Sequence, residues 1–235
     1  MNKLTLLLLP GMDGTGLLFR PFIEALGEEF DIKVVTYPTS EPVGYKELEL
    51  IALQYIPSDS PYIIIGESFS GPIAISIAAR NPPNLKGLIL CGGFARNPVP
   101  AFTKLSALIP FLPISFVPIS LLAPFILGKF YTKQLKLSLA LTLRRVKPEV
   151  IRARLNAVLT VDVISKLASI KVAFLYLRAT KDNLVQASAS KLISQYSPNL
   201  KVTEIEAPHL LLQVAPEKAA QIVKDFIRSL NNDFI

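Results

Sequence analysis

The hexapeptide GESFSG at positions 66–71 is the part of the sequence whose residue types most clearly suggest chemistry. It follows an apolar run at 62–65 and precedes a run of small and apolar residues at 72–79. A serine on a sharp turn between a strand and a helix is typical of a nucleophile elbow. The usual pattern has glycine two residues after the serine, where this chain has Ser70 and then a glycine. Alone, the string also fits an ordinary strand-to-helix turn, but its context favours Ser68 as a nucleophile.

His209 is the only histidine of the chain, and it follows a predicted strand at 202–205. A base in the loop after a strand can reach a serine at the carboxyl edge of a parallel sheet. A serine hydroxyl is a weak nucleophile without such a base. A lone histidine is more often structural than catalytic. If a Ser–His pair acts in this chain, however, His209 must supply the base.

The third candidate is Asp182, which comes soon after a predicted strand at 172–177. The chain order Ser68, Asp182, His209 is the order of nucleophile, acid and histidine in one large class of serine hydrolases. Asp182 would fix the imidazole tautomer and stabilise the imidazolium. Asp162 is the alternative acid.

The loop after the first predicted strand reads PGMDGTG at positions 10–16. Its glycines allow the backbone to pass close to a substrate. An oxyanion hole needs backbone N–H groups aimed at a carbonyl oxygen that gains charge, and we predict those of Met12 and Phe69. The loop lacks the lysine and the spacing of the common phosphate-binding loops. Asp13 is predicted to contact substrate, or alternatively to stabilise the turn through its side chain.

Short apolar runs alternate with segments of helical period along most of the chain. The runs that are apolar throughout indicate strands covered on both faces, and the alternation predicts an α/β fold with a mostly parallel six-stranded sheet. The expected strands are Leu4–Leu9, Ile32–Thr36, Tyr62–Ile65, Leu88–Leu90, Val172–Leu177 and Val202–Ile205. The expected helices are Leu17–Glu29, Tyr45–Ile56, Ser70–Ala79, Ala187–Tyr196 and Pro216–Leu230.

The alternation breaks at 97–166, which we interpret as a helical lid inserted into a core formed by 1–96 and 167–235. The stretch Leu105–Gly128 has no charged residue but contains four prolines, which disturb a membrane-spanning helix. A broken apolar cap is therefore expected, with peripheral membrane contact as an alternative. Three aromatic residues are predicted to bind an apolar substrate, or alternatively to pack the lid onto the core: Phe111, Phe116 and Phe125.

The net charge of +7 is concentrated in one segment, because residues 96–166 carry 11 Lys/Arg and only 2 Asp/Glu. This charge suits an acidic acyl carrier protein or anionic lipid, or is simply a solvated face. Nucleic acid is not expected, since no stacking aromatics are interleaved with the basic residues. Eight of the 11 are the candidates to receive the carrier protein or lipid: Lys129, Lys133, Lys136, Arg144, Arg145, Lys147, Arg152 and Arg154.

The cysteine and histidine content limits the classes of protein to consider. The chain has 235 residues, of which 51% are hydrophobic, so a large core is expected. One cysteine, Cys91, cannot form an internal disulfide, and a cytoplasmic location is expected. One histidine and one cysteine cannot form a zinc site of the usual kind. We therefore expect no metal and no cofactor.

These motifs together resemble the α/β-hydrolase superfamily, and the resemblance covers nearly all of the chain outside the insert. It implies a sheet of order 4-3-5-6-7-8 in the family's strand names. The phrases LLPGMDGTG and GESFSG are similar to the esterase/lipase part of phytyl ester synthases. They are equally similar to small bacterial carboxylesterases, including those that demethylate pimeloyl–carrier-protein esters. The chain departs from the family's common His-Gly loop by having Pro10-Gly11.

The expected activity is cleavage of a carboxylic ester or thioester with an apolar acyl group. The acyl group would be transferred to Ser68 and then to water activated by His209. The alternatives are an acyltransferase or a carbon–carbon hydrolase on the same fold, and a non-enzymatic scaffold that binds a ligand.

Overall fold

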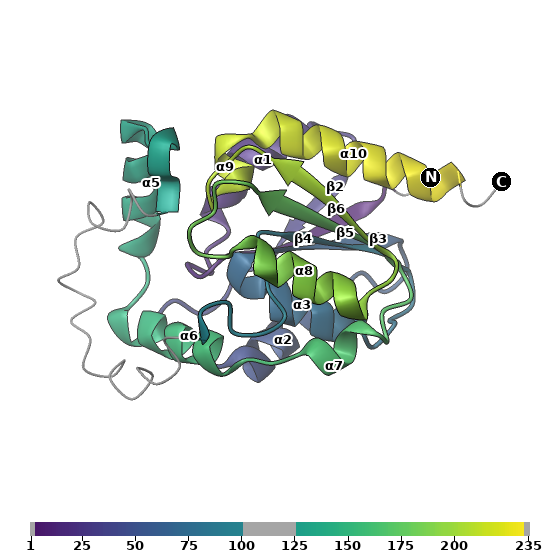
Figure 1. Cartoon of the computed structure of the whole chain (residues 1–235), viewed down its shortest axis with the longest axis horizontal. Helices are drawn as coiled ribbons and strands as arrows, with labels where there is room; N and C mark the ends of the chain where they lie inside the picture. The colour runs from purple at the N-terminus through teal and green to yellow at the C-terminus, as the bar shows by residue number, and fades with distance from the viewer. Residues whose placement is uncertain (1–2, 101–125, 233–235) are drawn as a thin grey trace.

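The computed structural model describes residues 3–100 and 126–232 of the chain, with side chains described to residue 230. In this part, six strands form one parallel sheet in the order β2-β1-β3-β4-β5-β6 (Figure 1). This order confirms the one that the family resemblance implies. The strands are β1 (Thr5–Leu9), β2 (Asp31–Val34), β3 (Tyr62–Glu67), β4 (Leu85–Cys91), β5 (Ala173–Ala179) and β6 (Leu200–Ile205).

The central strands are buried along almost their whole length, whereas the two edge strands are partly exposed. Every residue of β1 and β3 is buried. Most residues of β2 and β6 have some exposure. Apolar runs therefore mark the strands that helices cover on both faces. The predicted end of β3 was too early, because the strand continues through Gly66 and the buried Glu67, two residues that are uncommon in strands.

Helices form a layer on each face of the sheet (Figure 1). One layer contains α1 (Arg20–Leu26), α9 (Leu211–Val214) and α10 (Pro216–Asn232). The other contains α2 (Tyr45–Leu53), α3 (Gly71–Ala78), α7 (Ile164–Leu167) and α8 (Ala187–Tyr196). Alternate strand residues serve the two layers: Leu6 and Leu8 pack with the first layer, and Leu7 and Leu9 with the second.

The predicted helices near the carboxyl end of the chain agree better with the structure than the one predicted at 17–29. The bounds of α8 are those predicted, and Pro216 begins α10, where its missing N–H is harmless. The helix predicted at 17–29 was too long. A 3₁₀ turn, η1 (Leu17–Phe19), comes first, and α1 ends before Gly27, whose φ of 67° lies in the left-handed region.

The described part of the predicted lid is helical. It contains a 3₁₀ turn, η5 (Gly128–Phe130), and two longer helices, α5 (Lys133–Leu143) and α6 (Pro148–Thr160). Figure 1 places α5 on the side toward which the strand arrows point. The helix α7 packs against α3 and α8, within a layer of the core. The limits of the lid as a separate unit stay a prediction.

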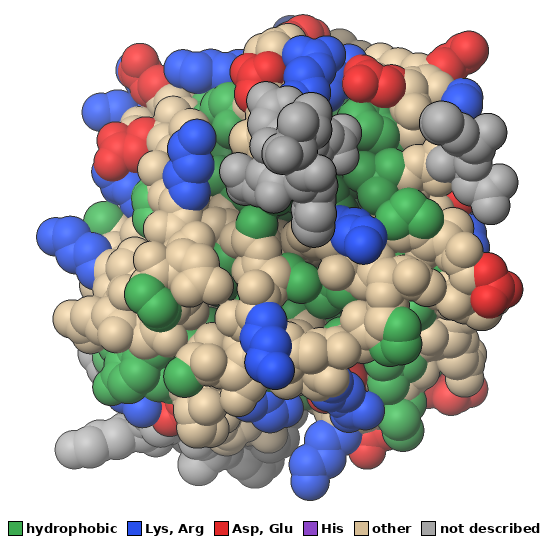
Figure 2. All heavy atoms as spheres, turned by 90° about the vertical axis from the view of Figure 1, so that its right-hand side faces the viewer, with side chains coloured by type: hydrophobic (Ala, Val, Ile, Leu, Met, Phe, Trp, Pro, Cys, Tyr) green, Lys and Arg blue, Asp and Glu red, His purple; other side chains and the backbone are tan. Residues whose placement is uncertain are grey.

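The three aromatic residues predicted to bind substrate, Phe111, Phe116 and Phe125, lie outside the described residues. Among the described residues, no helix combines the length and apolar character needed to cross a membrane. On the side of the amino ends of the strands, basic and acidic side chains are interspersed with apolar ones (Figure 2). The helix α5, which carries Lys133 and Lys136, lies at the opposite side (Figure 1).

Candidate active site

Ser68 lies on a strained turn directly after β3, as the sequence predicts. Its φ of 47° is unusual for a residue with a side chain. The 3₁₀ turn η2 (Ser68–Ser70) and then α3 follow at once. Gly66 must be small, because a Cβ there would lie 2.8 Å from the Cβ of Ala74. The local sequence therefore folds into a nucleophile elbow with Ser68 at its tip.

Ser70 explains why this elbow departs from the usual glycine pattern. Its side chain is buried, and Oγ donates a hydrogen bond of 2.5 Å to the carbonyl oxygen of Pro10. The same Oγ lies 2.9 Å from the hydroxyl of Tyr37. A hydroxyl at this position thus ties the elbow to the loop after β1, which a glycine cannot do.

Gly71, one position later, has the closest backbone contact of the elbow. A Cβ at Gly71 would lie 2.8 Å from both the N and the O of Phe94, which belong to the backbone and cannot move aside cheaply. We predict that Gly71→Ala lowers the free energy of unfolding by about 1–3 kcal/mol, the usual cost of overpacking. Urea unfolding should measure this loss. Gly44→Ala is the matched control, because its Cβ would meet only the flexible end of Glu47; equal losses in both variants would contradict the prediction.

Ser68, His209 and Asp182 form one chain of hydrogen bonds. Ser68 Oγ lies 2.7 Å from His209 Nε2, and His209 Nδ1 lies 2.7 Å from Asp182 Oδ2. The His209 side chain is 8% exposed and that of Asp182 is 2% exposed. The structure thus brings together three residues that the sequence predicts, from the ends of β3, β5 and β6.

The second oxygen of Asp182 defines the direction of these hydrogen bonds. Oδ1 accepts from the backbone N–H groups of Leu184, at 2.7 Å, and Val185, at 2.9 Å. With a carboxylate acting only as acceptor, His209 Nδ1 donates to Oδ2, and Nε2 is left to accept from the hydroxyl of Ser68. This arrangement can remove a proton from Ser68 as it attacks an electrophile.

Asp162, the alternative acid, lies elsewhere. Its Oδ2 accepts a hydrogen bond of 2.8 Å from Arg96, and its Oδ1 accepts from the backbone N–H of Ile164. Its side chain is about half exposed. Asp162 therefore stabilises a surface junction, and the structure pairs His209 with Asp182 instead.

The glycine-containing loop forms a compact turn around Asp13. The N–H of Gly14 donates to the carbonyl of Gly11, and Asp13 Oδ2 accepts from both the N–H and the hydroxyl of Thr15, at 2.8 and 2.5 Å. Burial raises the pKa of Asp13 above its usual range, and the bonds from Thr15 oppose this. Asp13 thus has the turn-stabilising contacts that were the alternative prediction. Its contact with substrate stays a prediction.

Met12 and Phe69, the two predicted oxyanion donors, are both held through their carbonyl oxygens. Arg154 Nη1 donates to the carbonyl of Met12 at 2.7 Å, and the hydroxyl of Tyr45 donates to that of Phe69 at 3.0 Å. The rings of Tyr45 and Phe69 stack with centroids 4.8 Å apart. These contacts hold the backbone at Met12 and at Phe69, the residue after Ser68, and the oxyanion role of the two N–H groups stays a prediction.

Glu67 is a buried carboxyl group that sequence reasoning did not identify. Its side chain accepts a hydrogen bond of 2.9 Å from Gln213 Nε2. Burial is the main cause that raises the pKa of Glu67 to about 7, and the negative charge of Asp13 adds to it, while the Gln213 bond opposes it. Nothing in the motif predicts this, because the residue before the serine tolerates many side chains.

The raised pKa of Glu67 predicts how stability depends on pH. A folded-state pKa of about 7, above the ordinary value of 4.5, contributes stability that is complete below pH 4.5 and is lost as pH rises through 7. The free energy of unfolding of the wild type should therefore fall as pH rises, whereas that of Glu67→Gln lacks this contribution. The difference between variant and wild type should shift in favour of the variant by about 2–3 kcal/mol from pH 5 to pH 8. Urea unfolding of both proteins at the two pH values measures the shift. A difference that is the same at both pH values would contradict the prediction.

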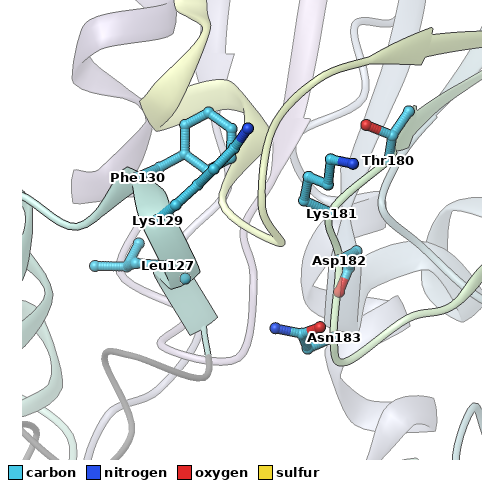
Figure 3. A pocket seen from close by; sticks show the side chains of 8 residues that line it. Leu127, Lys129, Phe130, Thr180, Lys181, Asp182 and Asn183 are labelled. Carbon is cyan, nitrogen blue, oxygen red and sulfur yellow. The ribbon is translucent and has the colours of Figure 1, made fainter.

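A cavity of about 470 Å³ opens beside the acid of the site (Figure 3). It lies between Leu127–Phe130 on one side and Thr180–Asn183 on the other, with Lys129 and Lys181 among the side chains that line it. A second cavity, of about 580 Å³, lies among α2, α3, α6 and α7, and its lining includes none of Ser68, Asp182 and His209. The first cavity thus meets the candidate site at Asp182, and its lining includes neither Ser68 nor His209.

Arg154 was predicted to belong to an exposed basic surface, and this is wrong. Its side chain is completely buried beneath α6, where it contacts the loop after β1. A signal was present in the sequence: Arg154 lies between Val150 and Val158 at spacings of four residues, and all three face the protein interior.

The parallel sheet, the elbow after β3 and the acid and histidine after β5 and β6 define the class of α/β-hydrolases. The model of one family, the serine aminopeptidases S33, matches residues 48–211. The chain therefore belongs to this family.

Solved structures agree in fold. An enol-lactonase from Burkholderia xenovorans superposes with a TM-score of 0.82 at 16% identity, over 97% of this chain and 92% of that one. A thermophilic esterase from Thermogutta terrifontis gives a TM-score of 0.83 at 18% identity, over 97% and 91% of the two chains. At these identities the likeness shows the fold alone.

Two curated relatives are more similar in sequence over a shorter stretch. Phytyl ester synthase 1 of Arabidopsis thaliana is 34% identical over 116 residues, which are 47% of this chain and 16% of that protein. Phytyl ester synthase 2 is 37% identical over 95 residues, 38% of this chain and 14% of that protein. The match thus spans about one sixth of the length of these relatives.

Proposed function

We propose that this protein is a serine hydrolase that cleaves a carboxylic ester or thioester with an apolar acyl group. The observation that carries the proposal is the continuous hydrogen-bonded chain from Ser68 through His209 to Asp182, with both distances 2.7 Å. Packing alone requires neither a strained serine nor a histidine aimed at it. A non-enzymatic scaffold would leave this arrangement without a use.

The geometry supports a two-stage acyl transfer. In the first stage Ser68 Oγ bonds to the carbonyl carbon while His209 Nε2 takes the hydroxyl proton, and the N–H groups of Met12 and Phe69 stabilise the oxyanion. The C–O or C–S bond breaks as His209 returns the proton to the leaving alcohol or thiol. In the second stage water, activated by His209, attacks the acyl-enzyme and releases the acid.

The substrate class rests on the surroundings of the site. Phe130 gives the cavity beside Asp182 an apolar side chain, which suits an acyl chain. The helix α5 carries Lys133 and Lys136 and no acidic residue, which would favour an acidic carrier protein that delivers the acyl group, as in the pimeloyl–carrier-protein methyl ester type. The names of the two curated relatives favour transfer to an alcohol as a second candidate activity.

Hydrolysis of p-nitrophenyl esters from acetate to palmitate tests the proposal, with His209→Ala as the inactive control. We expect turnover by the wild type with an optimum at a medium or long chain, and none by the variant. Addition of a long-chain alcohol separates the two activities, because an acyltransferase would form the alkyl ester at the expense of the free acid. Turnover that survives in His209→Ala would contradict the proposed mechanism.

A further inference from the structure

Arg154 is a charged side chain on α6 with no exposure to solvent. Its guanidinium spans two backbone carbonyls from different segments. Nη1 donates to Met12 at 2.7 Å, and Nη2 donates to Pro38 at 2.9 Å. The fork of a guanidinium suits such a two-point contact, whereas a lysine ammonium would act as a single point charge.

The surroundings of this guanidinium are shaped to fit it. Its central carbon lies 5.9 Å from the ring centroids of both Tyr37 and Phe69. A Cβ at Gly14 would lie 2.7 Å from both terminal nitrogens, so the glycine, at φ 72°, leaves the space that the guanidinium fills. The charge of Asp13 interacts favourably with that of Arg154, which offsets part of the cost of burial.

Both residues that are predicted to supply the oxyanion N–H groups therefore touch the same side chain. Arg154 bonds to the carbonyl of Met12 and lies over the ring of Phe69, which also stacks on the ring of Tyr45. The carbonyl and the N–H of Met12 belong to two different planar peptide units that meet at its Cα. A carbonyl held by Arg154 therefore limits the changes in the Met12 φ and ψ angles that would turn this N–H away from a substrate. Arg154 on α6 thus contacts both the loop after β1, at Met12, and the elbow, at Phe69.

We propose that Arg154 is a positioning residue that sets the geometry of the oxyanion hole. The segment between β4 and β5 then forms part of the catalytic apparatus and does more than cover it. The inference rests on the proposed function, because it assigns a role in stabilising the acyl-transfer transition state. Misplacing one oxyanion donor should lower kcat by about 10²-fold and leave KM nearly unchanged, since the ground-state carbonyl carries little charge.

The test compares Arg154→Lys and Arg154→Met with wild type and with Arg228→Met, a matched control on α10 whose arginine is largely exposed. Three quantities are measured: kcat, KM, and the inhibition constant of a trifluoromethyl ketone that forms a tetrahedral adduct with the serine. Circular dichroism and thermal unfolding report the folded fraction. We expect a fall in kcat of about 10²-fold, a parallel rise in the inhibition constant, and a change in KM of less than about threefold.

Other results would overturn either the role of Arg154 or the proposed function itself. Wild-type kcat in a folded Arg154→Lys variant overturns the inference, as does a rise in KM with kcat unchanged, which would make Arg154 a substrate-binding residue. A loss of activity that equals the loss of folded protein in both variants also overturns it, because the role would then be structural only. No ester turnover and no ketone inhibition in the wild type would overturn the proposed function itself, and the inference with it.

Discussion

Ser68→Ala is expected to lower kcat for ester hydrolysis by about 10⁴- to 10⁶-fold, the range found when an acting nucleophile is removed. Ser68 is the residue that the elbow holds at φ 47° with its Oγ at 2.7 Å from His209. Without this hydroxyl no acyl-enzyme can form, and only the oxyanion hole and substrate binding would remain to accelerate hydrolysis.

The measurement is steady-state hydrolysis of the best p-nitrophenyl ester by the wild type and the variant. Ser194→Ala is a suitable control, because the Ser194 hydroxyl on α8 donates within its own helix to the carbonyl of Ser190. We expect this control to keep wild-type kcat. The expected residual activity of Ser68→Ala is far below about 1% of wild-type kcat. A variant that retains more than this would show that another group is the nucleophile.

Asp182→Asn is expected to lower kcat by about 10⁴-fold, although the two side chains have nearly the same shape. Asp182 Oδ1 accepts from the N–H groups of Leu184 and Val185, so the amide oxygen of asparagine would occupy that position. The amide NH₂ would then face His209 Nδ1. A donor there forces Nδ1 to accept, and the ring proton moves to Nε2, which can no longer accept from Ser68.

The same substitution at the alternative acid provides the control. Asp162→Asn weakens a partly exposed ion pair with Arg96, and Asp162 makes no hydrogen bond to His209, so kcat should stay within a factor of about two. Steady-state kinetics at pH 7 distinguish the two variants. Similar losses in both, or a loss of less than tenfold in Asp182→Asn, would contradict the proposed orientation of His209.

The residues of the candidate site could be predicted because their positions follow from the topology. In a parallel sheet the carboxyl ends of the strands meet at one edge, so Ser68, Asp182 and His209, each after a predicted strand, were expected at that same edge. The bounds of the neighbouring elements were predicted less evenly: those of α8 agree, whereas β3, which leads into Ser68, continues two residues beyond its predicted end.

The supporting residues could not be found in the same way, because their roles arise from contacts between distant segments. Arg154 contacts Met12 across 142 positions of the chain, and Glu67 receives its hydrogen bond from Gln213 across 146. A lysine- and arginine-rich segment predicts an exposed surface by composition. Only the spacing of Arg154 with two valines indicated that it faces inward, and spacing does not identify the partner.

The most direct test of the central claim is covalent labelling with a fluorophosphonate, followed by intact mass and peptide mapping. This reagent reacts with a serine that an adjacent base activates, and needs no knowledge of the substrate. The account predicts one adduct per chain, located on Ser68, absent in Ser68→Ala and formed far more slowly in His209→Ala, with Ser229→Ala labelled as the wild type is. No adduct on the folded wild type, or an adduct that persists in Ser68→Ala, would contradict it.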